Sequence, residues 1–457
     1  MAADLASIDE AALDPEVLAV GREIAAGLPG STRNPLRALD DRAMRATTRD
    51  RELRAALFRL VDVTPACRSA DDLARHLTSF AAEVEHRPAT LDAAMRAAHT
   101  KAGRAALGRA AAAGVRHMAH RFIVGDSPAD ATDELERLRR AGIGNSVDLL
   151  GEATMTSAEA DRYASRCTEA LDVLAAAAER YPDHPLLDRD AAGPLPRVNL
   201  SVKVTALTPL IRPEHPRRGI DDAAGRLRPL LRSARAHGAH LHIDMESVDT
   251  FETTTELLLD LLAEPEFREG PSIGVVVQAY LRDSPQGLER LLAAVDAAGR
   301  AQPLTVRLVK GAYWDHEIVE AAQQGWRPPV FEDKAESDRN FERLTRRLID
   351  RAREAPASIR VAIGSHNLRS VSHAIAYSRL AGARGEELEI QVLRGLGDDL
   401  ARALAESGTR TRIYCPVGDL VAGMAYLVRR LLENTANTSF LAQQADGAPL
   451  EELLVPP

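Results

Sequence analysis

The spacing of hydrophobic and polar residues changes along the chain near residue 145. Over residues 1–120, Ala, Leu and Arg recur at helical spacing, for example from Leu91 to His117, which predicts amphipathic helices. Pro65 and Pro88 interrupt this pattern, as proline does between helices. We therefore expect residues 1–120 to form a helical arm and packing domain that carries no chemistry of its own.

From about residue 145 onward, short runs rich in β-branched residues alternate with amphipathic helical stretches. This alternation implies a parallel sheet, and eight repeats are the number that closes a (β/α)8 barrel. We therefore expect an α/β fold, with a TIM-like (β/α)8 barrel at residues 121–440 and a C-terminal tail at residues 441–457. The eight candidate strands begin at Ser146, Val198, His240, Ile273, Leu304, Ile359, Leu388 and Thr411.

An open, doubly wound sheet is the alternative architecture. It would usually carry a Gly-rich turn between its first strand and the following helix. Gly142-Ile-Gly144 and Gly395-Leu-Gly397 both lack the third glycine and the strand-before, helix-after context. Neither segment predicts a dinucleotide site, so the barrel is favoured.

Charge and composition narrow the expected partners and location. The chain of 457 residues has 58 Lys and Arg against 67 Asp and Glu, a net charge of −9. This acidic balance lacks the basic footprint of a nucleic-acid-binding protein, so no nucleic acid is expected as a partner. The first residues are acidic where a secretory signal is basic, and no apolar run reaches the ~18 residues of a membrane span. We expect a cytoplasmic protein and leave open a peripheral contact with the inner face of the membrane.

The three cysteines, Cys67, Cys167 and Cys415, lie far apart and form no Cys-x-x-Cys pair. They cannot build a disulfide framework or a four-sulfur metal site, and we interpret them as packing residues. No set of ligands with metal spacing and no Ser-His-Asp order is evident. We therefore expect no metal, and no side chain that acts as a nucleophile or a clear base.

In a (β/α)8 barrel the active site lies at the C-terminal ends of the strands. Cations, carboxylates, amides and tyrosines collect at the predicted strand ends, which is typical of a site for a small charged ligand. These polar residues are Asp148, Glu152, Lys203, Asp244, Glu246, Gln278, Tyr280, Arg307, Lys310, Tyr313, Ser365, His366, Asn367, Gln391, Arg394 and Tyr414.

The helix predicted after the eighth strand carries two adjacent arginines, Arg429 and Arg430, on the same face as Tyr426 and Glu433. One interpretation is a solvated surface on which Glu433 pairs with Arg429 four residues away. The flanking Leu and Val residues instead indicate a packed helix, so that the pair faces the barrel mouth. Two guanidiniums there would bind a small carboxylate bidentately, with Lys203 as a third positive charge.

The fifth predicted strand ends in Arg307, Lys310, Gly311 and Ala312. The two small residues leave room for a large planar group to approach the backbone, although a single inward salt bridge would also explain the cations. His366 has two interpretations as well. It is either a hydrogen-bonded barrel histidine or a donor to a cofactor phosphate.

Three segments together resemble a known family. Arg307-Leu-Val-Lys-Gly-Ala-Tyr-Trp-Asp, Tyr414-Cys-Pro-Val-Gly and Tyr426-Leu-Val-Arg-Arg-Leu-Leu-Glu-Asn look like the signature segments of proline dehydrogenase. The likeness is greatest to the proline dehydrogenase portion of the bifunctional proline utilisation flavoenzymes, and it covers about residues 120–440. The preceding helical region is similar to the arm and helical domain of those proteins.

The resemblance implies FAD bound without a Rossmann fold, and oxidation of L-proline to Δ1-pyrroline-5-carboxylate by hydride transfer from C5 to flavin N5. Electrons then pass to a quinone, in the first step of proline catabolism. A pyrroline-5-carboxylate/glutamate semialdehyde dehydrogenase would be the downstream enzyme. Two alternatives stay open: a dehydrogenase of hydroxyproline or another cyclic imino acid, and a non-catalytic barrel that binds a carboxylate.

The resemblance also implies roles for individual residues, carried over position by position. Substrate-binding residues would be Lys203, Asp244, Leu308, Ala312, Tyr313, Leu393, Tyr414, Tyr426, Arg429 and Arg430. Glu152 would be a gate that pairs with Arg429 over bound substrate. Cofactor-binding residues would be Gln278, Arg307, Val309, Lys310, Gly311, Trp314, Ser365, His366, Asn367, Gln391 and Glu433.

Some positions depart from the family pattern. Glu332 and Asp333 stand where the family commonly has Thr and a basic residue, Phe341 replaces a frequent Tyr, and Arg394 stands where His is usual. Acidic residues near a pyrophosphate would repel it. We therefore expect contacts to the ADP half of FAD to differ here.

Overall fold

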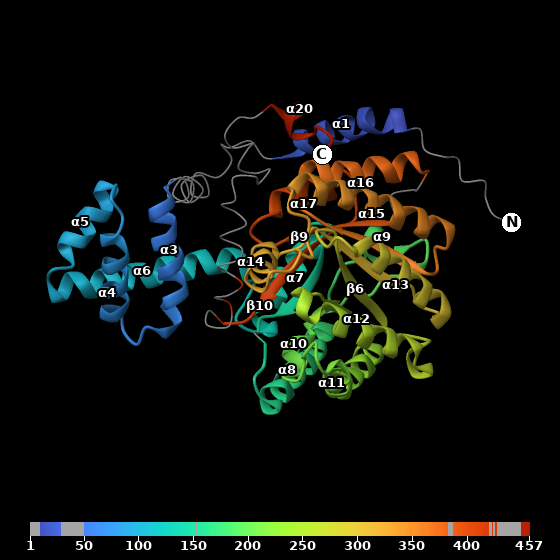
Figure 1. The fold of residues 1–457 in the computed structure, drawn as a ribbon, viewed down its shortest axis with the longest axis horizontal. Helices are drawn as coiled ribbons and strands as arrows, with labels where there is room; N and C mark the ends of the chain where they lie inside the picture. The colour runs from blue at the N-terminus through green and yellow to red at the C-terminus, as the bar shows by residue number, and fades with distance from the viewer. Residues whose placement is uncertain are drawn as a thin grey trace.

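The computed structural model describes residues 10–28, 50–151, 153–382, 387–419, 423, 426 and 449–457. Eight parallel strands close a barrel, and neighbouring strands follow one another in chain order until the last pairs with the first (Figure 1). The strands are β1 (Gly144–Leu149), β4 (Asn199–Lys203), β5 (His240–Asp244), β6 (Ser272–Gln278), β7 (Leu304–Val309), β8 (Ile359–Gly364), β9 (Leu388–Leu393) and β10 (Thr411–Val417).

All eight predicted strands form, and the α/β barrel is confirmed. Helices follow the strands and surround the barrel (Figure 1). They are α8 (Ser157–Ala178), α10 (Val204–Leu207), α11 (Pro216–Ala236), α12 (Val248–Ala263), α13 (Ser284–Ala298), α14 (Trp314–Gln324), α15 (Lys334–Glu354), α16 (Leu368–Leu380) and α17 (Asp398–Glu406). Short elements add to them at α9 (Pro185–Asp188), η2 (Pro265–Phe267) and a small hairpin of β2 (Arg189–Asp190) and β3 (Gly193–Pro194).

The inside of the barrel is unusually polar. TIM barrels mostly fill their interior with layers of Val, Ile and Leu. Here the Ser146 hydroxyl donates to Asn199 Oδ1 at 2.7 Å, and His240 Nδ1 contacts Ser272 Oγ at 2.8 Å. The barrel therefore relies on matched donors and acceptors as well as on apolar packing, because a buried polar group without a partner is costly.

The N-terminal helices form two groups. α1 (Glu10–Gly27) packs on barrel helices α16 and α17, beside the C-terminal α20 (Leu450–Leu453) (Figure 1). A separate cluster extends to one side of the barrel (Figure 1) and comprises α3 (Arg51–Val63), η1 (Thr64–Ala66), α4 (Ala70–Ala82), α5 (Ala89–Ala97) and α6 (Lys101–Phe122). The helices expected in this region are present among the described residues, with α1 packed on the barrel and the others in the separate cluster.

The end of α6 connects the helical cluster to the barrel mouth, before α7 (Pro128–Arg140) leads into β1. Phe122 is wholly buried, and it belongs to one apolar cluster with Leu150 after β1 and with Tyr426. Arg121 Nε also donates to the Gly395 carbonyl after β9 at 3.2 Å. The helical region thus borders the face on which the expected site lies.

Among the helices described, none combines the length and the apolar character that a membrane crossing requires.

Candidate active site

Asp244 lies at the C-terminal end of β5 and receives hydrogen bonds from residues on β7 and β10, two strands that are not adjacent to β5 in the barrel. Its Oδ1 accepts from Arg307 Nη1 at 2.8 Å, and its Oδ2 accepts from the Tyr414 hydroxyl at 2.7 Å. Side chains alternate between the two faces of a strand, and all three of these residues occupy positions that face the inside of the barrel. A single buried carboxylate therefore orients a guanidinium and a phenol at the mouth.

Lys203, the last residue of β4, extends the same cluster. Its ammonium donates to Asp148 Oδ1 at 2.5 Å and lies 4.0 Å from Asp244 Oδ2. Burial alone would lower the pKa of Lys203, but the carboxylates of Asp148 and Asp244 raise it above its ordinary value. The lysine is thus a charged, nearly buried cation, which is the state that binds a carboxylate.

Arg307 and Gln391 meet inside the barrel, as two of the residues expected to contact flavin. Arg307 Nε donates to Gln391 Oε1 at 2.6 Å, and the Arg307 guanidinium lies 5.4 Å from the centre of the Tyr414 ring. Gln278 ends β6 in register with Val309, so both side chains point into the barrel. Gln278 Nε2 donates to the Glu246 carbonyl at 3.0 Å.

The loop after β7 approaches β6 closely at a glycine. Gly311 has φ +131, a conformation that L residues rarely adopt, and a Cβ there would lie 2.4 Å from the Tyr280 ring. Lys310 Nζ pairs with Asp338 Oδ1 on α15 at 2.5 Å, and burial lowers the pKa of Lys310. Trp314 is partly exposed and donates from Nε1 to the Phe331 carbonyl at 2.8 Å.

The segment after β8 makes hydrogen bonds within the protein. Asn367 is the N-cap of α16 and accepts from Ser370 N at 2.9 Å, while the Ser365 hydroxyl accepts from Asn367 N at 3.1 Å. His366 Nε2 accepts from Leu393 N at 2.8 Å. This nitrogen is therefore the unprotonated one in neutral His366, which leaves Nδ1–H as the donor.

The remaining expected residues divide by position. Leu393 and Tyr313 are half-buried at the mouth, and Ala312 is exposed. Leu308 alternates to the face opposite Arg307 and Val309 and is wholly buried in the apolar core, so it supports the site from behind rather than lining it. Tyr426 is buried in the cluster at the end of α6. Glu152, Arg429, Arg430 and Glu433 lie outside the described residues.

The positions that depart from the family pattern have local partners. Asp333 is the N-cap of α15, where it accepts from Ala335 N at 2.9 Å, and Glu332 accepts from Arg282 at 3.1 Å. Phe341 is wholly buried, and the centre of its ring lies 5.6 Å from Lys310 Nζ. Arg394 pairs with Glu134 and Asp398. Capping and pairing therefore explain the acidic residues without a role in binding.

Sequence reasoning assigned no role to three carboxylates that hold polar side chains of the site in place. They are Asp148 at Lys203, Asp338 at Lys310, and Glu389 at Gln391, to which it is joined by a hydrogen bond of 2.6 Å. Asp148 was among the polar residues identified at the predicted strand ends, but its pairing with Lys203 was not predicted. Asp338 lies four residues after Lys334 on α15, but nothing in the sequence connects it to β7.

Buried polar atoms without partners remain at the mouth. Among the described residues they include Asp148 Oδ2, Gln278 Oε1 and the Tyr280 hydroxyl. Asp148 Oδ2 and Gln278 Oε1 can accept hydrogen bonds, and the Tyr280 hydroxyl can also donate one. The mouth therefore fits a polar, planar group such as a flavin better than it fits a metal ion, since its acids are paired with Lys and Arg.

One group of potential metal ligands in the described part of the chain lies away from the barrel. It consists of Cys67, Asp72 and His76 at the start of α4. The Cys67 thiol donates to the Val63 carbonyl at 3.4 Å, and Asp72 accepts from Arg68 N at 3.2 Å. Local hydrogen bonds thus account for two of the three groups. Cys67 is only partly buried, unlike Cys167 and Cys415.

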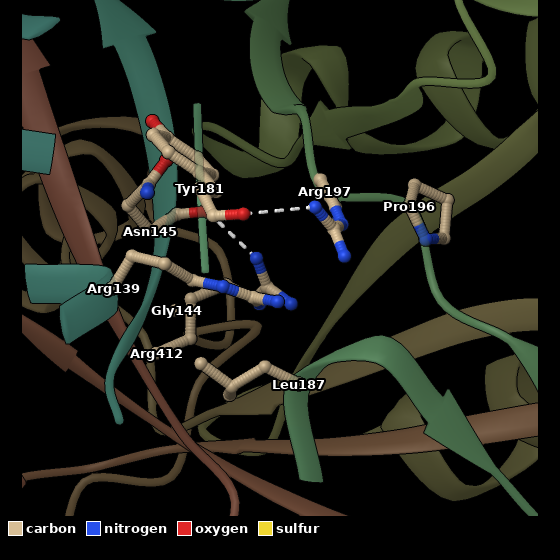
Figure 2. Close-up of a pocket in the computed structure, with 8 residues that line it drawn as sticks. All are labelled: Arg139, Gly144, Asn145, Tyr181, Leu187, Pro196, Arg197 and Arg412. Atoms are coloured by element: carbon tan, nitrogen blue, oxygen red, sulfur yellow. Dashed lines mark hydrogen bonds between the residues drawn. The ribbon is translucent and has the colours of Figure 1, made fainter. Parts of the chain in front are cut away.

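A small pocket lies at the opposite, N-terminal end of the barrel, beside the first residue of β1 (Figure 2). Arg139, Arg197 and Arg412 point toward it. Asp188 accepts hydrogen bonds from Arg139 and Arg197, and Glu389 accepts two from Arg412. Arg197 also donates to Asp183, so three carboxylates balance the three arginines and the pocket offers an anion no unpaired arginine.

Comparison with known proteins places this geometry in a family. The model of the proline dehydrogenase family matches residues 131–443, and the model of the proline utilization A N-terminal domain matches residues 14–122. The bifunctional protein PutA of Salmonella typhimurium is 32% identical over 383 residues, which are 81% of this chain and 27% of that protein. Proline dehydrogenase 1 of Bacillus subtilis is 27% identical over 340 residues, covering 73% of this chain and 92% of that protein.

A solved structure agrees. PutA from Bdellovibrio bacteriovorus, inactivated by N-propargylglycine, superposes with a TM-score of 0.87 at 36% identity, covering 96% of this chain and 44% of that one. The chain thus spans only about a quarter to a half of these longer relatives. The family model nevertheless covers most of the barrel and its mouth. The chain belongs to the proline dehydrogenase family.

Proposed function

We propose that this protein is a flavin-dependent proline dehydrogenase that oxidises L-proline to Δ1-pyrroline-5-carboxylate. The observation that carries the proposal is the pair of buried cations at the mouth, Lys203 and Arg307, which Asp148 and Asp244 hold beside Tyr414. A buried cation next to an aromatic wall suits a small imino acid, whose carboxylate needs a charged partner. Membership of the proline dehydrogenase family supports the same substrate.

FAD is the cofactor in this proposal, and when bound it supplies N5 as the acceptor of the hydride from C5 of proline. Gln278 Oε1 is a buried acceptor that still lacks a partner among the described residues, and a flavin N–H could fill that role. Arg307 would oppose the negative charge of a reduced flavin. The proposed cofactor contacts are Gln278, Arg307, Val309, Lys310, Gly311, Trp314, Ser365, His366, Asn367, Gln391 and Glu433.

The protein's task is to hold proline still and to exclude water, because it needs no nucleophile. Lys203 would bind the carboxylate together with Arg429 and Arg430, and Asp244 would keep Tyr414 against the ring. Tyr313, Leu393, Ala312 and Tyr426 would complete the pocket, and Glu152 would act as its gate. Such a clamp can bring donor and acceptor to roughly 3–3.5 Å, the separation that hydride transfer needs.

The proposal extends to electron flow. A quinone would take the electrons, which requires a protein on the cytoplasmic side that touches the inner face of the membrane. The product would pass to a pyrroline-5-carboxylate/glutamate semialdehyde dehydrogenase.

The test is a titration of the purified, FAD-loaded chain with L-proline under anaerobic conditions. We expect the visible flavin absorbance to bleach with proline, and a quinone to restore it. Hydroxyproline in a parallel titration addresses the alternative substrate, and D-proline is the control for specific binding.

The outcomes separate the alternatives. If hydroxyproline bleaches the flavin in preference to proline, the proposed substrate is wrong but the proposed flavin-dependent oxidation stands. Failure to bind FAD, together with proline binding detected by calorimetry, would favour a non-catalytic carboxylate-binding barrel.

A further inference from the structure

A chain of buried polar side chains runs inside the barrel from its N-terminal end to the mouth. At the N-terminal end, Arg412 borders the small pocket and donates from Nη1 to the Asn145 carbonyl at 2.6 Å (Figure 2). Arg412 also holds both oxygens of Glu389, at 2.7 Å and 2.9 Å. Gln391 Nε2 then donates to Glu389 Oε1 at 2.6 Å, and Gln391 Oε1 accepts from Arg307 Nε at 2.6 Å.

Glu389 determines the orientation of the Gln391 amide. Burial would raise the pKa of Glu389, but Arg412 lowers it to about 2, so the carboxylate is ionised and offers only acceptors. The amide lies between this acceptor and the Arg307 N–H. Rotating the amide by half a turn would set its NH2 against the arginine and its oxygen against the carboxylate. One amide orientation is therefore strongly favoured.

The orientation of Gln391 in turn sets the position of Arg307. The guanidinium has a rigid, planar fork of donors. Gln391 holds it at Nε and Asp244 holds it at Nη1, at 2.6 Å and 2.8 Å. Two fixed points on a planar group define its plane, and with it the direction of the remaining N–H bonds.

We propose that Glu389 is a positioning residue for the reaction: acting through Gln391, it fixes the plane of the Arg307 guanidinium that faces the flavin. The proposal rests on the proposed function, because the contact between Arg307 and flavin belongs to it. Glu389 itself touches neither substrate nor cofactor, since it lies one hydrogen bond deeper in the barrel than Gln391. Without it, the Gln391 amide can rotate and Arg307 loses its acceptor at Nε, which leaves Asp244 at 2.8 Å and a long contact to Ser201 Oγ at 3.5 Å.

The competing explanation is that Glu389 only balances the charge of Arg412. A matched pair elsewhere in the barrel separates the two. Asp190 binds buried Arg360 at two points, 2.7 Å and 3.2 Å, and no described hydrogen bond connects that pair to Arg307 or Gln391. Asp190→Asn therefore removes the same kind of buried ion pair but leaves the hydrogen bonds of Gln391 and Arg307 in place.

The experiment measures, for Glu389→Gln and Asp190→Asn in the FAD-loaded protein, thermal unfolding, the flavin reduction potential with a redox dye, and proline kinetics. We expect both variants to lose thermal stability. Only Glu389→Gln should show a more negative potential and a kcat lowered by about tenfold or more, with KM nearly unchanged, because a small misplacement can cost up to 10²-fold. The double variant Glu389→Gln/Arg412→Met, which restores charge balance, should recover stability but keep the lower potential.

Two results would overturn the proposal. One is an unchanged potential and kcat in Glu389→Gln, and the other is a normal potential in the double variant, which would make charge balance the whole effect. The proposed function is judged separately, by whether the wild-type protein binds FAD and is bleached by proline.

Discussion

Tyr414 shows how a single hydroxyl contributes to both stability and the site. Its O–H donates to Asp244 Oδ2 at 2.7 Å, and Asp244 also binds Arg307. Burial and the negative charges of Asp148 and Asp244 raise the pKa of Tyr414 well above its ordinary value. The phenol therefore stays protonated and acts as a donor throughout the neutral range.

The variant Tyr414→Phe keeps the ring and removes only this donor. Hydrogen bonds to charged groups contribute about 1.5–3 kcal/mol, so we expect the free energy of unfolding to fall by that amount. We also expect proline KM to rise, because Asp244 and the cations it orients lose one of their constraints. Urea unfolding and steady-state kinetics with a dye acceptor measure the two effects.

Tyr377→Phe is the matched control. The Tyr377 hydroxyl is also buried and hydrogen-bonded to a carboxylate, that of Asp350, at 2.9 Å and 3.0 Å, but it lies on α16 outside the barrel. It should lose similar stability without a change in KM. An equal proline KM in the two variants would show that the Tyr414 hydroxyl does not contribute to proline binding.

Among the elements, the loop between β7 and α14 is tightly constrained by its backbone. It carries Lys310 and Tyr313 and leads into Trp314, the first residue of α14. It turns at Gly311, where φ is +131 and the Tyr280 ring leaves no space for a Cβ. A glycine is needed there for two separate reasons, conformation and close contact.

The variant Gly311→Ala therefore should displace the Tyr280 ring and the loop together. Gly325→Ala is the control, since Gly325 also has positive φ, +69, but has open space around it. Strain from a left-handed conformation alone costs on the order of 1–3 kcal/mol. We expect Gly325→Ala to lose that much stability with normal flavin bleaching, and Gly311→Ala to lose more and to bleach poorly. Similar behaviour of the two variants in urea unfolding and proline titration would contradict the close-contact argument.

At the scale of the whole molecule, buried histidines should make the protein sensitive to acid. Burial lowers the pKa of His240 and of His373 to about 3, and that of His242 well below its usual value, with nearby arginines adding to the effect. These side chains are neutral in the folded protein but gain a proton near pH 6.5 when unfolded. Below pH 6.5 the unfolded state binds more protons, so stability falls as pH falls toward 3.

Below about pH 6.5, each of these histidines should lower the free energy of unfolding by about 1.4 kcal/mol for every unit by which the pH falls. The three together should lower it by roughly 4 kcal/mol per pH unit. Urea unfolding at pH 7, 6 and 5 measures the slope. His373→Gln, which can still accept from Arg346 as His373 does at 3.2 Å, should reduce the slope by about a third. Equal stability at pH 7 and pH 5 would mean that these histidines are protonated in the folded state.

The local pattern was sufficient to predict the strands and the type of barrel. Runs such as Ile273 to Gln278 are rich in β-branched residues and are followed by amphipathic helices, and both signals are local in the sequence. The strand-end rule also identified Lys203, Asp244 and Arg307 as neighbours, because parallel strands in a closed barrel end on one face. The sequence was also enough to predict that Leu308 points to the face opposite Arg307, because adjacent residues of a strand point to opposite faces.

The partners of these residues depended on the tertiary structure. Glu389 meets Arg412 and Arg360 meets Asp190 across 23 and 170 residues of sequence, through strand register that no local pattern specifies. The packing of α1 on α16 and α17 likewise depends on surfaces that exist only after the barrel closes. The sequence by itself determined which segments become strands and helices, and which polar residues gather at the C-terminal ends of the strands. Only the folded chain decided which carboxylate holds which cation, because hydrogen bonds of 2.5–3 Å require a register and a geometry that are long-range properties.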